Sequence, residues 1–123
     1  MSQARVIFFG LAAIYLLGVV VQFFLAGLGA FLETSYDAHQ TLGYILAAIA
    51  LILLVLAIAG RLPRLVFLLA IALLGLNVLQ IVLARVEVGE VAALHVVNAL
   101  VVFFVAHELM QRSRRYLASK IAA

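Results

Sequence analysis

The sequence contains no cysteine and no tryptophan, and it has a single proline, Pro63, among its 123 residues. Without cysteine, the chain can form no disulfide, thiolate metal site, iron–sulfur cluster or covalent CxxCH haem attachment. Charged residues are also scarce, at 11% of the chain, and only five of them are acidic. No Ser/His/Asp grouping, glycine-rich phosphate loop or pair of buried carboxylates can be assembled from the residues that remain.

Apolar residues are abundant instead: 69% of the chain is hydrophobic and its mean hydropathy is +1.34. A soluble domain of this size could not bury so much apolar surface, so the composition predicts an integral membrane protein whose main partner is the lipid bilayer. The formal net charge of +3 comes from basic residues at the ends of apolar segments. That placement is typical of a membrane-orientation signal and does not indicate binding to nucleic acid.

Four apolar runs are long enough to cross a bilayer, which takes about 20 residues. The first has an apolar core well beyond the roughly 7–15 residues of a signal peptide, so we expect it to be retained as a span. Short polar loops separate the runs, which predicts one all-α domain, 1–123, folded as an antiparallel four-helix bundle. We expect a basic tail after the last span to lie as a helix at the membrane surface. The spans are predicted at 6–32, 41–59, 65–84 and 91–109, and the tail at 111–123.

The charges divide between the two ends of the predicted bundle. One end has Arg5, Arg61, Arg64, Arg112, Arg114, Arg115 and Lys120, whereas the other has Glu33, Asp37, Glu87 and Glu90 with Arg85 as its one basic residue. By the positive-inside rule, both termini are expected in the cytoplasm, and a bacterial inner membrane is the expected location.

Two histidines occupy matched positions on alternate spans, near the predicted outer face. His39 stands just before the second span, and His95 lies about 6 Å, or one turn, inside the fourth. An ionisable group inside a span is a functional candidate. Each has a small residue at i+4, Gly43 or Ala99, which leaves room on that helical face for a flat group. Taken singly, His39 is better explained as an ordinary interfacial histidine beside Asp37.

As a pair, these histidines favour the axial ligation of a b-type haem, whose iron accepts a neutral imidazole on each side. A weak internal repeat agrees with this interpretation, since Gln22 precedes His39 by seventeen residues and Gln80 precedes His95 by fifteen. Two hairpins related by an axis along the membrane normal would place the histidines opposite each other. His107 lies about 18 Å further along the last span and is not expected to be a ligand.

Several polar residues could support this site. Gln22, Gln80, Asn98 and backbone carbonyls are available as partners for the second nitrogen of each imidazole. The same amides could instead hydrogen-bond between helices without any cofactor. Arg85, at the end of the third span, could pair with a haem propionate, or could be an interfacial anchor paired with Glu87.

The four spans with His39 and His95 resemble the four-helix b-haem membrane proteins, in particular one half of a haem A synthase. The resemblance implies axial histidines near the outer side of the second and fourth spans. The synthase has two such halves, and its glutamate and arginine near the first histidine would fall on Tyr36 and Gln40 here. Oxidation of a haem methyl is therefore not implied. The chain also resembles a small uncharacterised family of four-span membrane proteins.

The sequence thus predicts a membrane cytochrome that binds haem b non-covalently through His39 and His95 and transfers single electrons, with a quinone or a redox protein as partner. Two axial histidines leave no open position for oxygen. One alternative is a cofactor-free structural or assembly subunit of a membrane complex. Another is a haem-modifying or haem-sensing protein in which one histidine dissociates. An oligomeric assembly is compatible with each of them.

Overall fold

The computed structural model describes residues 3–121, and every regular element in that part of the chain is an α-helix. All four helices are long and apolar enough to cross a membrane, which confirms the predicted all-α membrane fold. They are α1 (Gln3–Leu32), α2 (Asp37–Ala59), α3 (Arg64–Leu83) and α4 (Gly89–Ile121).

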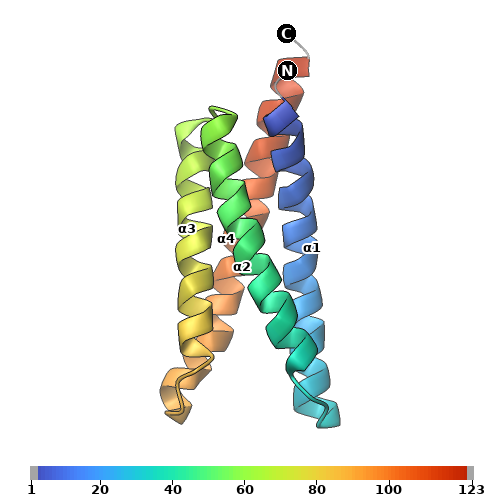
Figure 1. Ribbon diagram of the computed structural model, residues 1–123, viewed down its shortest axis with the longest axis vertical. Helices are drawn as coiled ribbons and strands as arrows, with labels where there is room; N and C mark the ends of the chain where they lie inside the picture. The colour runs from blue at the N-terminus through green and yellow to red at the C-terminus, as the bar shows by residue number, and fades with distance from the viewer. Residues whose placement is uncertain (1–2, 122–123) are drawn as a thin grey trace.

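Consecutive helices run antiparallel and surround a common axis (Figure 1). Helix α1 contacts α2 and α4, and α3 contacts the same two helices, so α1 faces α3 diagonally and α2 faces α4. The helices converge at the end that holds both chain termini and the α2–α3 turn, which we call the closed end (Figure 1). At the opposite, open end, the α1/α2 pair diverges from the α3/α4 pair (Figure 1).

The hydrophobic core fills the half of the bundle nearest the closed end. Alanines on all four helices contribute to it and let the backbones approach closely. Large apolar side chains cover the outer surface, with Phe24 and Phe104 each 65% exposed, as expected for helices that face lipid. The buried core comprises Phe8, Ala12, Tyr15, Val19, Leu46, Ala50, Leu53, Ala57, Val66, Ala70, Leu73, Val102, Ala106 and Leu109.

The turn between α2 and α3 is sharp because α2 ends in a Schellman motif. The N–H of Leu62 donates to the carbonyl of Ala57, and the N–H of Arg61 donates to that of Ile58, both at 3.0 Å. Arg61 has a φ of 48°, in the left-handed position where glycine is the commonest residue. Pro63 follows at the N-cap of α3. The reversal sets α3 antiparallel to α2.

The basic tail differs from its expected form as a separate helix, because α4 continues without a break to Ile121. Leu109 and Ser113 are buried, so this part of α4 still packs against the bundle. The guanidinium of Arg5 lies 5.4 Å from the centre of the Tyr116 ring, a cation–π contact, and its Nε donates to the carbonyl of Gly60 at 3.0 Å. Arg5 therefore ties the start of α1 to both the α2–α3 turn and the tail. Residues 122 and 123 of the predicted tail lie outside the described part.

Candidate functional site

A cavity of about 690 Å³ occupies the open half of the bundle, between all four helices. Its volume falls within the range of about 300–1,000 Å³ that is typical of small-molecule and cofactor pockets. Of the residues that the sequence suggests for a haem site, Gln22, His39, Gly43, Gln80, Arg85, His95 and Ala99 line this cavity. Asn98 is buried and does not line it.

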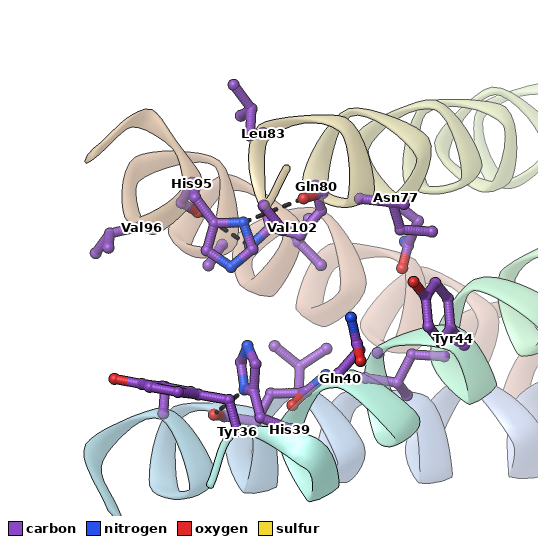
Figure 2. A pocket seen from close by; sticks show the side chains of 18 of the residues that line it. Tyr36, His39, Gln40, Tyr44, Asn77, Gln80, Leu83, His95, Val96 and Val102 are labelled. Carbon is purple, nitrogen blue, oxygen red and sulfur yellow. Dashed lines mark hydrogen bonds between the residues drawn. The ribbon is translucent and has the colours of Figure 1, made fainter. Parts of the chain in front are cut away.

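The two histidines face each other across the cavity. His39 projects from α2 and His95 from the diagonally opposed α4, and Figure 2 shows their imidazole rings pointing toward one another. The ring centroids are 6.2 Å apart and the ring planes are inclined by 64°. Both side chains are partly buried. The structure therefore brings together the two residues that the sequence pairs as candidate ligands.

Each histidine is oriented by a backbone carbonyl of the preceding helix. The Nδ1 atom of His39 lies 3.2 Å from the carbonyl oxygen of Gln22, and the Nδ1 atom of His95 lies 3.1 Å from that of Gln80. A carbonyl can only accept, so each Nδ1 carries a proton, and in the neutral imidazole each Nε2 then carries the lone pair. The Gln–His repeat in the sequence thus corresponds to a repeated contact, made through the main chain of the glutamines.

Around His95, amide groups complete a hydrogen-bond network. The Nε2 of Gln80 donates both to the carbonyl of His95, at 3.0 Å, and to the Nε2 of its ring, at 3.1 Å. The side-chain nitrogen of Asn98 donates to the Oε1 of Gln80 and to the carbonyl of Leu76. Asn98 therefore fixes the side chain of Gln80 and makes no direct bond to the imidazole among those recorded for the described residues.

Around His39, the amide of Gln22 is arranged differently. A Cβ atom added at Gly43 would lie 3.0 Å from the Nε2 of Gln22, so the missing side chain of Gly43 makes room for this amide. The Oε1 of Gln22 is buried and has no hydrogen-bond partner among the described residues. The small residue at i+4 from His39 therefore serves close packing of α1 on α2 as well as the shape of the cavity.

A further polar pair, Tyr15 and Asn77, lies where the cavity meets the core. The side-chain nitrogen of Asn77 donates to the hydroxyl of Tyr15 at 2.6 Å and to the carbonyl of Leu73 at 2.7 Å. Both residues are buried and both line the cavity. Tyr15 was not predicted from the sequence, because its neighbours in the first span are apolar and give no sign of a polar contact. The side chain of Asn77 needs a hydrogen-bond partner inside a span, and that need could have indicated such a contact.

At the open end of the cavity, Arg85 reaches across to α2. Its Nη2 donates to the hydroxyl of Tyr44 at 3.1 Å, and both side chains are exposed and line the cavity. This hydrogen bond raises the pKa of Arg85 above its ordinary value, and a guanidinium is charged at neutral pH in any case. Tyr36 lies beside His39, with ring centroids 6.2 Å apart and an interplanar angle of 79°.

The remaining histidine, His107, is exposed on α4 and lies 3.4 Å from Gln111 through their Nε2 atoms; it does not line the cavity. No group of three or more His, Cys, Asp or Glu side chains is placed to hold a metal ion within residues 3–121. Asp37 lines the cavity together with His39 and His95, but the three side chains are not placed as a metal-binding group. The two imidazoles suit the axial positions of a haem.

No curated protein and no solved structure matches the chain, so its resemblance to one half of a haem A synthase remains an interpretation of the architecture and the two histidines. A family of unknown function (DUF6220) matches residues 22–88. The matched region includes Gln22, His39, Gln80 and Arg85, and it ends before His95. Because it covers more than half of the 123 residues, the chain belongs to this family, whose function is unknown.

Proposed function

We propose that this protein is a membrane-embedded b-type cytochrome, in which His39 and His95 bind one non-covalent haem b in the open half of the bundle. The observation that carries the proposal is the matched orientation of the two imidazoles. Each donates its Nδ1 proton to a backbone carbonyl, at 3.2 Å from Gln22 and 3.1 Å from Gln80. Metal-binding histidines commonly use their second nitrogen in this way, which fixes the tautomer and strengthens the other nitrogen as a ligand.

The distance between the rings supports the same proposal. Imidazole nitrogen binds a metal ion at about 2.0–2.1 Å, so two rings on opposite sides of one ion have centroids about 6 Å apart. The centroids of His39 and His95 are 6.2 Å apart. The cavity that contains them has a volume of about 690 Å³ and is lined mainly by apolar side chains, as an apolar macrocycle requires.

A haem held in this way would supply a one-electron couple. Because His39 and His95 would take both axial positions, the site favours electron transfer over oxygen binding. Its partner is proposed to be a membrane quinone or a redox protein, with both termini in the cytoplasm of a bacterial cell and the open end on the outer side of the inner membrane. The charge distribution supports this orientation, since the closed end carries every arginine except Arg85.

One observation favours a second candidate, a cofactor-free structural or assembly subunit. The Nε2 of His95 already accepts a hydrogen bond from Gln80, at 3.1 Å, so this imidazole is satisfied by the protein alone. Ligation through this nitrogen requires the amide of Gln80 to move away. A haem sensor in which His95 leaves the iron and returns to Gln80 would use the same contact.

An optical spectrum of the protein, purified in a non-ionic detergent after expression with ample haem, tests these candidates. The cytochrome predicts about one haem per chain, a low-spin spectrum in both oxidation states and no shift with carbon monoxide. A haem-free protein that also fails to bind added haemin would contradict it and favour the structural subunit. A reduced spectrum that shifts with carbon monoxide would favour the sensor.

A further inference from the structure

The charge on Arg85 is not balanced by a carboxylate in the described part of the chain. The open end carries four acidic residues, Glu33, Asp37, Glu87 and Glu90, yet the guanidinium donates to the neutral hydroxyl of Tyr44. Among the side chains that the structure describes, the one ion pair joins Arg112 to Glu108, near the closed end. Pairing of Arg85 with Glu87, which the sequence allows, is therefore not observed.

The position of Arg85 relates this charge to the cavity. Arg85 follows the end of α3, Tyr44 lies in the second turn of α2, and both side chains line the cavity that contains His39 and His95. The bond to Tyr44 uses one of the five N–H donors of the guanidinium, so the others can reach a second acceptor. Tyr44 thus holds a cation with free donors at the mouth of a pocket that is lined mainly by apolar side chains.

We propose that Arg85, positioned by Tyr44, binds a carboxylate of the ligand that His39 and His95 hold, namely a porphyrin propionate. This inference rests on the proposed function. A porphyrin is an apolar disc with two carboxylates on one edge, so its favoured orientation in the cavity places that edge toward water and the cation. A planar guanidinium can bind a carboxylate through two parallel hydrogen bonds, which is geometry that a lysine cannot reproduce.

The test is a titration of the detergent-solubilised apo-protein with two porphyrins, haemin and haemin dimethyl ester, whose propionates are blocked. For the wild type, we expect the ester to bind roughly three- to fivefold more weakly than haemin, the size of effect typical of an exposed charge pair. Arg85→Gln should weaken haemin binding by a similar factor and leave ester binding unchanged. Because exposed pairs are screened, the difference should shrink at high salt.

Three further variants test the contact between Arg85 and the propionate more closely. Arg64→Gln removes a positive charge at the closed end and should change neither affinity. Tyr44→Phe keeps the ring but removes the hydroxyl, so it should reduce the preference for haemin less than Arg85→Gln does. A positive charge near the iron stabilises the reduced state, so Arg85→Gln should lower the reduction potential of the haemin complex. Arg85→Lys keeps the charge and should restore that potential. The lysine variant should recover only part of the affinity.

The outcomes separate this inference from the proposed function. If both porphyrins give a bis-imidazole spectrum but Arg85→Gln weakens both equally, the propionate contact is overturned and the cytochrome stands. If neither porphyrin gives that spectrum in the wild type, both proposals fail. A lipid phosphate is the other source of an anion at this level. If Arg85→Gln changes ester binding in phosphatidylglycerol bilayers but not in phosphatidylcholine bilayers, Arg85 binds a lipid phosphate. That result would overturn the proposed contact with a propionate.

Discussion

The side chain of Asn77 donates a hydrogen bond to the hydroxyl of Tyr15 at 2.6 Å, although the two residues lie on the diagonally opposed helices α3 and α1. The backbones of these helices are not in contact within the described residues. Since both side chains are buried between the core and the cavity, this bond joins the two helical hairpins at the point where the bundle begins to open. The bond therefore lies at the boundary between the packed half of the bundle and the cavity.

Tyr15→Phe should therefore destabilise the bundle. The change removes one of the two acceptors of the Asn77 amide and leaves the carbonyl of Leu73. Hydrogen bonds between membrane helices are worth about 0.6 kcal/mol on average and at most about 1.7 kcal/mol, so we expect a loss in this range in the free energy of unfolding. Unfolding with sodium dodecyl sulfate in mixed micelles measures it. Ile14→Val, at a lipid-facing neighbour, is the control, and equal stability of the two variants would contradict the role of the bond.

The orientation of the protein can be tested with single cysteines, because the natural chain has none. Ser35→Cys places a thiol in the α1–α2 loop at the open end, and Ser119→Cys places one near the end of α4; both serines are exposed. The arginines of the closed end predict that a membrane-impermeant maleimide labels Ser35→Cys in intact cells. Ser119→Cys should react only after the cells are permeabilised. The reverse pattern would place His39 and His95 on the cytoplasmic side.

The fold could be predicted from the sequence because each span is a long apolar run, and lipid leaves the backbone little choice but a helix. The end of α4 was harder to predict. The apolar run of the sequence ends near Leu109, but backbone hydrogen bonding does not depend on hydropathy, and Ser113 and Tyr116 continue the packed face. A run of apolar residues therefore predicts which part of a helix has apolar surroundings, but it does not predict where the helix ends.

The candidate site could be predicted in part. The matched depth of His39 and His95 on alternate spans was enough to predict that the two side chains lie opposite each other, and both line one cavity. The acceptors of their Nδ1 protons could not be predicted as particular atoms, because every residue has a carbonyl and only the rotation of α1 and α3 selects those of Gln22 and Gln80. The same reason explains why Tyr44 was not predicted as the partner of Arg85. Contacts between distant helices depend on their relative rotation, which the sequence pattern leaves free.

Gly43→Leu should lower haem loading without removing a ligand. A leucine at this position must displace the amide of Gln22, which lies 3.0 Å from the position of the first side-chain carbon, and it adds volume inside the cavity. Haem content per chain, measured after expression and by haemin titration, should fall well below that of the wild type.

Two variants control for this substitution. Gly43→Ala should load almost normally, because the far end of the Gln22 side chain can shift by a few tenths of an ångström. Gly75→Leu should also load normally, since Gly75 is exposed and has nothing within 4 Å of its added Cβ. Full loading of Gly43→Leu would mean that the small residue serves helix packing alone.

The most direct test of the central claim is the spin state of the ferric iron in single-histidine variants, measured by electron paramagnetic resonance. Two axial imidazoles predict a low-spin signal in the wild type. His39→Ala and His95→Ala should each convert it to high spin or lose the haem, and added imidazole should restore the low-spin signal where haem is retained. His107→Ala, at an exposed position outside the cavity, should keep the wild-type signal. An unchanged low-spin signal in His95→Ala or His39→Ala would contradict ligation by this pair.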